Sequence, residues 1–109
     1  MKKVALLVIV VMVGFGVIGC VTTGDKKTSP DVEVYFKLGN THAKEGRYQE
    51  AIEAYKQVIK LKPDLAEAHN NLGLAYLKIK DKVNALEEYK ILKTLNAEMA
   101  NKLFNLINK

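Results

Sequence analysis

The sequence predicts an all-α fold of two helical hairpins followed by a C-terminal capping helix. Three observations support this prediction. Apolar residues recur at helical spacing along most of residues 32–108, a block of 34 residues occurs twice, and the last eleven residues have one apolar and one polar arc. At 109 residues the chain has room for one small domain and its termini.

The repeat is seen when residues 32–65 are aligned with residues 66–99. Nine of the 34 aligned positions are identical, where about two are expected by chance. The proline and glycine breaks between apolar segments place the helix ends. We therefore expect helices near residues 32–45, 48–61, 66–79, 82–95 and 98–108.

Small residues occupy matched places in the two copies. Gly39 and Gly73 are aligned, as are Ala51 and Ala85. Glycine inside a helix costs about 1 kcal/mol relative to alanine, so its presence at matched places indicates a packing role. We expect two antiparallel helices to approach closely at these residues, with tyrosines filling the flanks.

The order of residues in each copy resembles the tetratricopeptide repeat, whose signature is aromatic, Leu-Gly, aromatic, Ala, aromatic, Pro. The signature positions are Tyr35, Leu38, Gly39, His42, Ala51, Tyr55 and Pro63 in the first copy, and His69, Leu72, Gly73, Tyr76, Ala85 and Tyr89 in the second. The sequence departs from the signature at His42 and His69, which occupy aromatic places, and at Ala97 in place of proline; the second copy also has Lys80 where the first has Gly46. The resemblance implies a short right-handed solenoid with repeats at residues 32–65 and 66–99 and a capping helix at residues 100–109 that begins near residue 98.

The capping helix is predicted from its helical projection. Six apolar residues fall within one arc, and the opposite arc holds only asparagine and lysine; the six are Met99, Ala100, Leu103, Phe104, Leu106 and Ile107. We expect the apolar face to close the end of the stack. Because about three repeats are usually needed for stability, the cap or a partner, including a second copy in a homodimer, must contribute.

The N-terminal residues have the order of a secretory signal: a basic start, an apolar run over Val4–Ile18 and a small residue before Cys20. A helix of fifteen residues covers roughly 22 Å, short for a hydrocarbon core of about 30 Å. The last four residues, Val17–Cys20, resemble the lipobox of bacterial lipoproteins. An uncleaved signal anchor with an incidental thiol is the alternative.

The lipobox resemblance implies cleavage after residue 19, a diacylglycerol thioether on Cys20 and a further acyl chain, such as palmitate, on its amine. Residues 20–31 are then the lipidated cysteine and a tether rich in Thr, Ser, Gly and Lys. The resemblance places the protein in the outer membrane facing the periplasm in a diderm cell, and otherwise on the outer face of the cell membrane.

No catalytic or cofactor-binding signature occurs in the sequence. We find no nucleophile motif, phosphate-binding glycine loop or metal-ligand spacing, and therefore expect neither an enzyme, a cofactor nor a metal. Nucleic-acid binding is disfavoured because Arg47 is the only arginine and lysines alternate with acids. We expect His42 and His69 to be packing residues, and the adjacent Glu87 and Glu88 to be solvated partners of lysines.

The tetratricopeptide resemblance implies that the first helix of each hairpin lines a concave groove for a protein partner. It places eight candidate binding residues there: Phe36, Lys37, Asn40, Lys44, Asn70, Asn71, Leu74 and Lys78. Asn40 and Asn71 match two asparagines that bind peptide in chaperone-binding members, whereas the cations of that clamp are missing. Bonding between helices is an equally good role for both asparagines.

We therefore expect a lipid-anchored protein-interaction module that acts as an adaptor or assembly factor and binds a partner peptide or helix in this groove. The alternative is a structural subunit that docks into an envelope complex by its ends or its convex face. The sequence does not name the partner.

Overall fold

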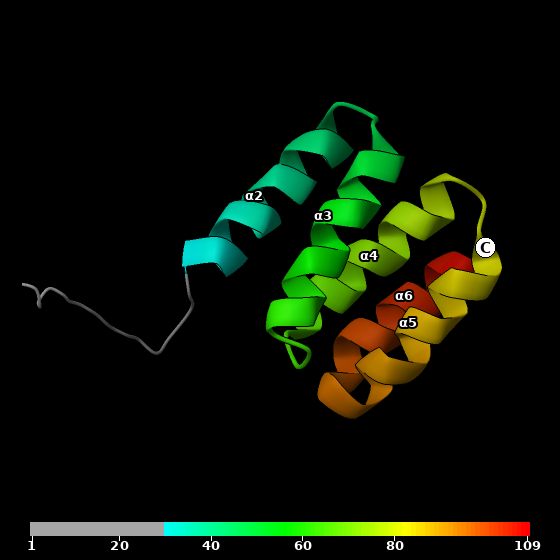
Figure 1. The fold of residues 1–109 in the computed structure, drawn as a ribbon. Coiled ribbons are helices and arrows are strands. Elements are labelled where there is room, and N and C mark those ends of the chain that lie inside the picture. Colours follow the sequence, from blue (N-terminus) through cyan, green and yellow to red (C-terminus); the bar gives the residue numbers. More distant parts are fainter. Residues whose placement is uncertain (1–29) are drawn as a thin grey trace, which may run out of the picture.

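The computed structural model describes residues 30–109; the predictions for the signal peptide, Cys20 and the start of the tether lie outside the described residues. The described part holds five helices, joined by short turns (Figure 1). They are α2 (Pro30–Lys44), α3 (Tyr48–Leu61), α4 (Ala66–Lys78), α5 (Lys82–Leu95) and α6 (Ala97–Ile107). The prediction of an all-α fold is confirmed, and each predicted helix end lies within two residues of the observed one.

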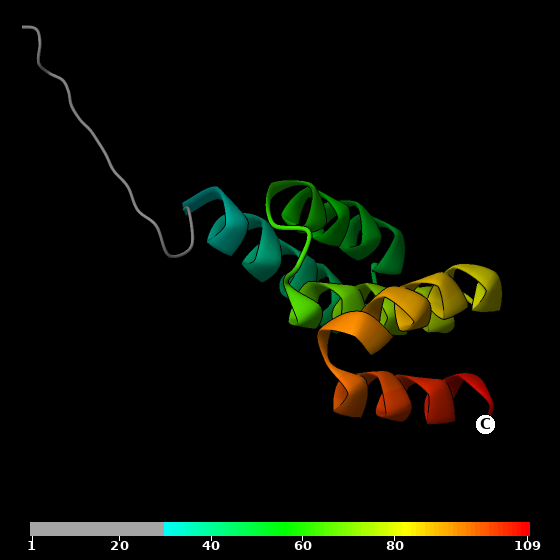
Figure 2. The same ribbon diagram turned by 90° about the horizontal axis from the view of Figure 1, so that it is seen from below.

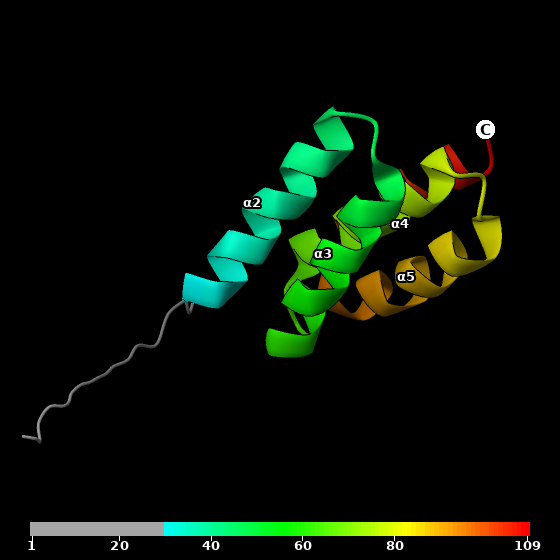
Figure 3. The same cartoon turned by 45° about the horizontal axis from the view of Figure 1, so that its top comes forward.

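The helices stack in chain order, each antiparallel to the one before it. α3 packs between α2 and α4, and α5 packs between α4 and α6. α6 lies at the opposite end of the stack from α2 (Figure 2), and Figure 3 shows α2 beside α3 at the other end. α4 packs against α6, whereas α2 and α4 make little direct contact with each other.

The core runs along the inner faces of the helices. Its main cluster includes residues from α3 to α6: Ala51, Ile52, Tyr55, Leu72, Ala75, Tyr76, Ala85, Leu92, Ala100, Leu103 and Ile107. A smaller cluster of Val32, Val58 and Ala68 joins α2, α3 and α4. Most of the free energy of such a fold comes from burying these apolar faces, since isolated helices of this length are marginal in water.

The two repeat glycines are packing residues, but their neighbours differ. A Cβ added to Gly39 would lie 2.6 Å from Cε1 of Tyr55, so the tyrosine fills the flank as expected. A Cβ on Gly73 would instead lie 2.8 Å from Cδ2 of Leu103 in α6. The expectation of a flanking tyrosine is therefore wrong for the second copy, where Tyr89 stacks on Phe104 at 4.8 Å between ring centroids.

The turns inside the two hairpins have the same geometry. Arg47 N donates to His42 O and Asp81 N donates to Tyr76 O, both at 2.8 Å. This bonding pattern ends a helix in a residue with left-handed backbone, usually glycine. Gly46 has a φ of 79°, and the aligned Lys80 has a φ of 66°. Lys80 thus adopts a conformation that L-residues rarely occupy.

The turn before the cap differs from the turn between the two copies. Asn96 is both the last cap of α5 and the first cap of α6, and its side chain accepts from Met99 N at 3.0 Å. The aligned residues of the first copy, at Pro63, form a longer loop. α6 begins at Ala97, directly after this shared cap, three residues earlier than the repeat spacing requires.

The expected apolar face of the cap is only partly buried. Ala100, Leu103 and Ile107 are buried and Met99 is half-buried. Phe104 and Leu106 are 39% and 44% exposed, contrary to expectation. These two residues lie at the edges of the predicted arc, which is wider than the face that α4 and α5 cover.

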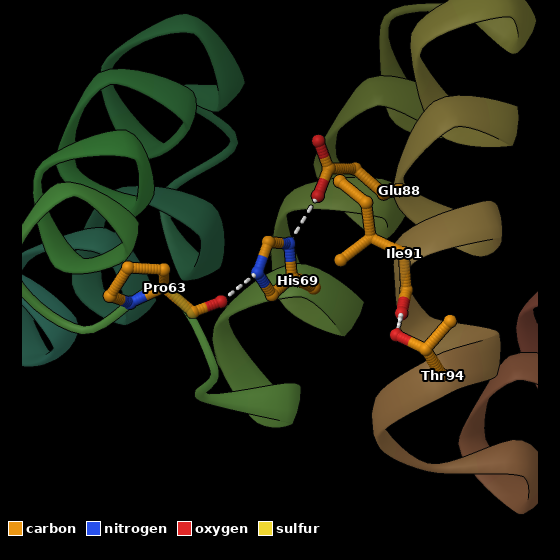
Figure 4. A network of polar contacts seen from close by, with 5 residues as sticks. All are labelled: Pro63, His69, Glu88, Ile91 and Thr94. Atoms are coloured by element: carbon orange, nitrogen blue, oxygen red, sulfur yellow. Dashed lines mark hydrogen bonds and ion pairs between the residues drawn. The ribbon is translucent and has the colours of Figure 1, made fainter.

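The buried His69 and the half-buried Glu88 form a polar pair across the second hairpin (Figure 4). His69 Nδ1 lies 2.7 Å from Glu88 Oε1, and His69 Nε2 lies 2.7 Å from Pro63 O. Glu87 pairs with Lys90 on the surface, as predicted. The prediction of a solvated carboxylate is wrong for Glu88, because this residue faces α4 and its carboxylate contacts the buried His69.

Candidate partner-binding groove

Two neighbouring cavities lie between α2 and α4, which make little direct contact with each other. The first is about 580 Å³ and is lined by Val32, Glu33, Val34, Phe36, Lys37, Asn40, Leu65 and Glu67. The second is about 350 Å³ and is lined by Asn40, Ala43, Lys44, Tyr48, Tyr55, Asn71, Leu74, Ala75 and Lys78. Asn40 borders both cavities, and the surface that they line together is here called the A-helix groove.

The middle of the groove is a hydrogen-bonded cluster of three side chains. Tyr55 Oη donates to Asn40 Oδ1 at 2.6 Å. Asn71 Nδ2 donates to the same oxygen at 3.3 Å, which joins α2 to α4. Bonding between helices, one of the two roles left open for the asparagines, is therefore present.

This cluster leaves polar groups available for a ligand. Asn40 Nδ2 and Asn71 Oδ1 have no hydrogen-bond partner within residues 30–109. A free amide donor and a free amide acceptor match the N–H and C=O groups of an extended peptide. The asparagines can therefore bond each other and a ligand at the same time.

Tyr55 of α3 fixes the position of the Asn40 side chain through this hydrogen bond. Its ring is buried and packs edge-on against Phe36, with centroids 6.0 Å apart. Burial raises the pKa of Tyr55 above its ordinary value of 10.0, against a smaller opposing effect of the Asn71 side chain. The phenol therefore stays protonated and remains a donor to Asn40 at neutral pH.

Seven of the eight candidate binding residues lie on the groove. Phe36 and Lys37 line the first cavity, Asn40 lines both, and Lys44, Asn71, Leu74 and Lys78 line the second. Asn70 is half-buried and lines neither cavity. Its neighbour Asn71 points to α2 instead, since adjacent helical residues point about 100° apart.

Sequence reasoning missed several lining residues. Tyr48 and Tyr55 come from α3, and Leu65 comes from the turn before α4. They were missed because the resemblance directs attention to the first helix of each hairpin only. For Tyr55 a signal was available: a buried tyrosine hydroxyl needs a hydrogen-bond partner, and Asn40 is its nearest polar neighbour.

The histidines lie outside the groove lining. His69 is buried and bonded on both ring nitrogens, which agrees with the predicted packing position. His42 is half-buried, and its Nδ1 atom is buried without a hydrogen-bond partner in the described part of the chain. Within residues 30–109, no group of three or more His, Cys, Asp or Glu side chains is placed to hold a metal ion. No helix of the described region is both long and apolar enough to span a bilayer.

Family models match the two hairpins. A model described as TPR repeat matches residues 39–80, and one described as Tetratricopeptide repeat matches residues 66–98. Together they cover more than half of the chain. The chain is a tetratricopeptide repeat protein. No curated protein matches this tetratricopeptide repeat chain.

Family membership agrees with the fold and gives the chain a general role. The stacked antiparallel helices are the helical repeat that the sequence predicted. Tetratricopeptide repeats form protein-interaction modules, so this chain is one.

Proposed function

We propose that this tetratricopeptide repeat protein is a lipid-anchored adaptor that captures a partner protein in the A-helix groove. The observation that carries the proposal is the cluster of Asn40, Asn71 and Tyr55, which places a free amide donor and a free amide acceptor where the two cavities meet. Apolar contacts with Phe36 and Leu74 would add affinity on either side of the amides.

The membrane anchor rests on the sequence. Cys20 lies at the end of a signal-like segment, and residues 21–29 connect it to α2. Two or more acyl chains, at about 0.8 kcal/mol per buried CH₂, would hold the protein on a bacterial envelope membrane. The groove would then be presented close to the bilayer surface.

The anchor is tested by replacing Cys20 with Ser. In cells fed an alkyne-labelled fatty acid, the wild-type chain should carry the label and sediment with membranes. The C20S chain should carry no label and lose the processing that the wild type undergoes. Labelled, membrane-bound C20S protein would overturn the lipoprotein assignment.

The groove is tested by capture of partners cross-linked in intact cells. Substitution of Asn71 and Leu74 by Ser should remove the captured partner, since it deletes one free amide and one apolar wall of the second cavity. Val83, which is 72% exposed and lines neither cavity, provides a matched control as V83S. Circular dichroism of each variant checks that the helices remain folded.

A second mode, docking by the C-terminal end, has its own supporting observation. Five large apolar side chains of α5 and α6 are at least one third exposed: Val83, Ile91, Leu95, Phe104 and Leu106. Exposed apolar surface is a feature of interaction surfaces where it is continuous. Loss of capture in F104S but not in the Asn71 and Leu74 variant would favour this mode over the groove.

A further inference from the structure

The A-helix groove has charges of opposite sign at its two ends. Glu33 and Glu67 occupy aligned places in the two copies and line the first cavity. Lys44 and Lys78 also occupy aligned places and line the second cavity, which has no carboxylate in its lining. Lys37 is the one cation in the lining of the first cavity, which leaves that end with a net negative charge.

These charges are free to meet a ligand. None of the five side chains forms an ion pair with another residue of the described region 30–109. Glu33 and Glu67 lie in the first turns of α2 and α4. Lys44 and Lys78 lie in the last turns of the same two helices. Eleven residues of helix separate Glu33 from Lys44, a rise of about 16 Å.

We propose that the groove selects an extended partner segment with a basic side chain at the Glu33 and Glu67 end and an acidic side chain at the Lys44 and Lys78 end. A strand rises about 3.3 Å per residue, so the two charged residues of the partner are about five positions apart. This inference rests on the proposed function of the groove and adds the chemistry and the orientation of the partner.

An extended segment fits the groove better than a helix because of the two free amide groups in the middle of the groove. Asn40 Nδ2 and Asn71 Oδ1 need a backbone acceptor and a backbone donor. A partner helix bonds these groups internally and offers neither, whereas an extended chain offers both. The charged ends then orient a segment that the amides hold at its centre.

The same charges also stabilise α2 and α4 through the helix dipole, which favours acids at the start and bases at the end of a helix. That effect acts on the stability of the chain and does not depend on which peptide is bound. Selectivity among peptides therefore separates the proposed role from the dipole effect.

The test is a selection of random dodecapeptides on the full chain purified in detergent. Peptides that also bind the N71S/L74S variant are removed, so the remainder are specific for the groove. The inference predicts that these peptides carry a Lys or Arg and an Asp or Glu about five positions apart. Groove-specific peptides without that charge pattern would overturn the inference and leave the proposed groove function intact, whereas the absence of any such peptide would overturn both.

Charge reversal provides the second part of the test. K44E/K78E should weaken the best selected peptide about tenfold, and changing the acidic residue of that peptide to Lys should restore the affinity. The control K56E/K102E reverses two exposed lysines outside both cavities and should leave the affinity unchanged. Equal loss in K44E/K78E and in the control, or no rescue by the changed peptide, would contradict the inference.

Discussion

His69 and Glu88 lie 2.7 Å apart, Nδ1 to Oε1, inside a hairpin whose aligned positions in the first copy hold Tyr35 and Ala54. The carbonyl of Pro63 can only accept, so His69 Nε2 donates to it and one further proton is shared between His69 and Glu88. The pair is therefore neutral as a whole, whichever partner carries that proton. The second copy therefore has a polar pair where the first copy has an aromatic residue and an alanine.

Removing the carboxylate should destabilise the fold. E88A leaves a buried ring nitrogen without a partner and should lower the free energy of unfolding by about 1–3 kcal/mol. E88Q keeps a donor for Nδ1 and should cost less. Urea denaturation measures both, and the double variant H69Y/E88A, which copies the first repeat, should lose less than the sum of the single variants. Additive losses would show that the two residues are not coupled.

The two repeat glycines should differ in their sensitivity to alanine. G39A forces a Cβ against the buried ring of Tyr55 and should cost about 1–3 kcal/mol in the free energy of unfolding. G73A meets one methyl group of Leu103 at 2.8 Å and its next contacts at 3.4 and 3.5 Å, whereas G39A meets three ring atoms within 3.0 Å, so the cost of G73A should be smaller. Thermal unfolding of the two variants gives the order directly, and the reverse order would contradict the packing described for Tyr55.

The turn at Lys80 should be improved by glycine. Lys80 has a φ of 66°, a conformation that costs an L-residue about 1–2 kcal/mol. K80G should therefore raise the free energy of unfolding, although by less than the full strain, since glycine gains entropy in the unfolded chain. The aligned variant G46K should lower it. A destabilised K80G would show that the lysine side chain makes a compensating contact.

The N-cap of α5 should make stability depend on acid pH. The Asn84 side chain, and then the Asn84 backbone N–H, lower the pKa of Asp81 below its ordinary value of 3.8. A lowered folded pKa means that this stabilisation is present above pH 3.8 and is lost as the pH falls through the folded value. The difference in melting temperature between wild type and D81A should therefore shrink in that range. A constant difference down to pH 2 would exclude the charged cap as its cause.

The repeat made most of the fold predictable, because each copy carries its own turns and small residues. The repeat spacing alone does not give the start of α6, because the single residue Asn96 caps both α5 and α6 and replaces the longer loop of the first copy. Glu88 was assigned to the surface because adjacent acids on a helix usually face water. Its aligned residue Ala54 is buried, and that comparison between copies was the signal for a buried position.

Most of the residues that line the candidate groove were predictable from the sequence, whereas the shape of the groove was not. The resemblance identified the helices that line it, and seven of eight named residues do so. Its shape follows from the small number of direct contacts between α2 and α4 and from the hydrogen bond by which Tyr55 holds Asn40 between the two cavities. Both depend on tertiary packing, which single-residue patterns do not encode.

The most direct test of groove binding is photo-cross-linking in living cells from two matched positions. Phe36 lines the groove and Phe104 is 39% exposed on α6, and benzoylphenylalanine at either position keeps an aromatic ring there and adds the photoreactive benzoyl group. Binding in the groove predicts a cross-linked partner from position 36 and none from position 104. Cross-linking from position 104 alone would contradict it and assign partner binding to the C-terminal end.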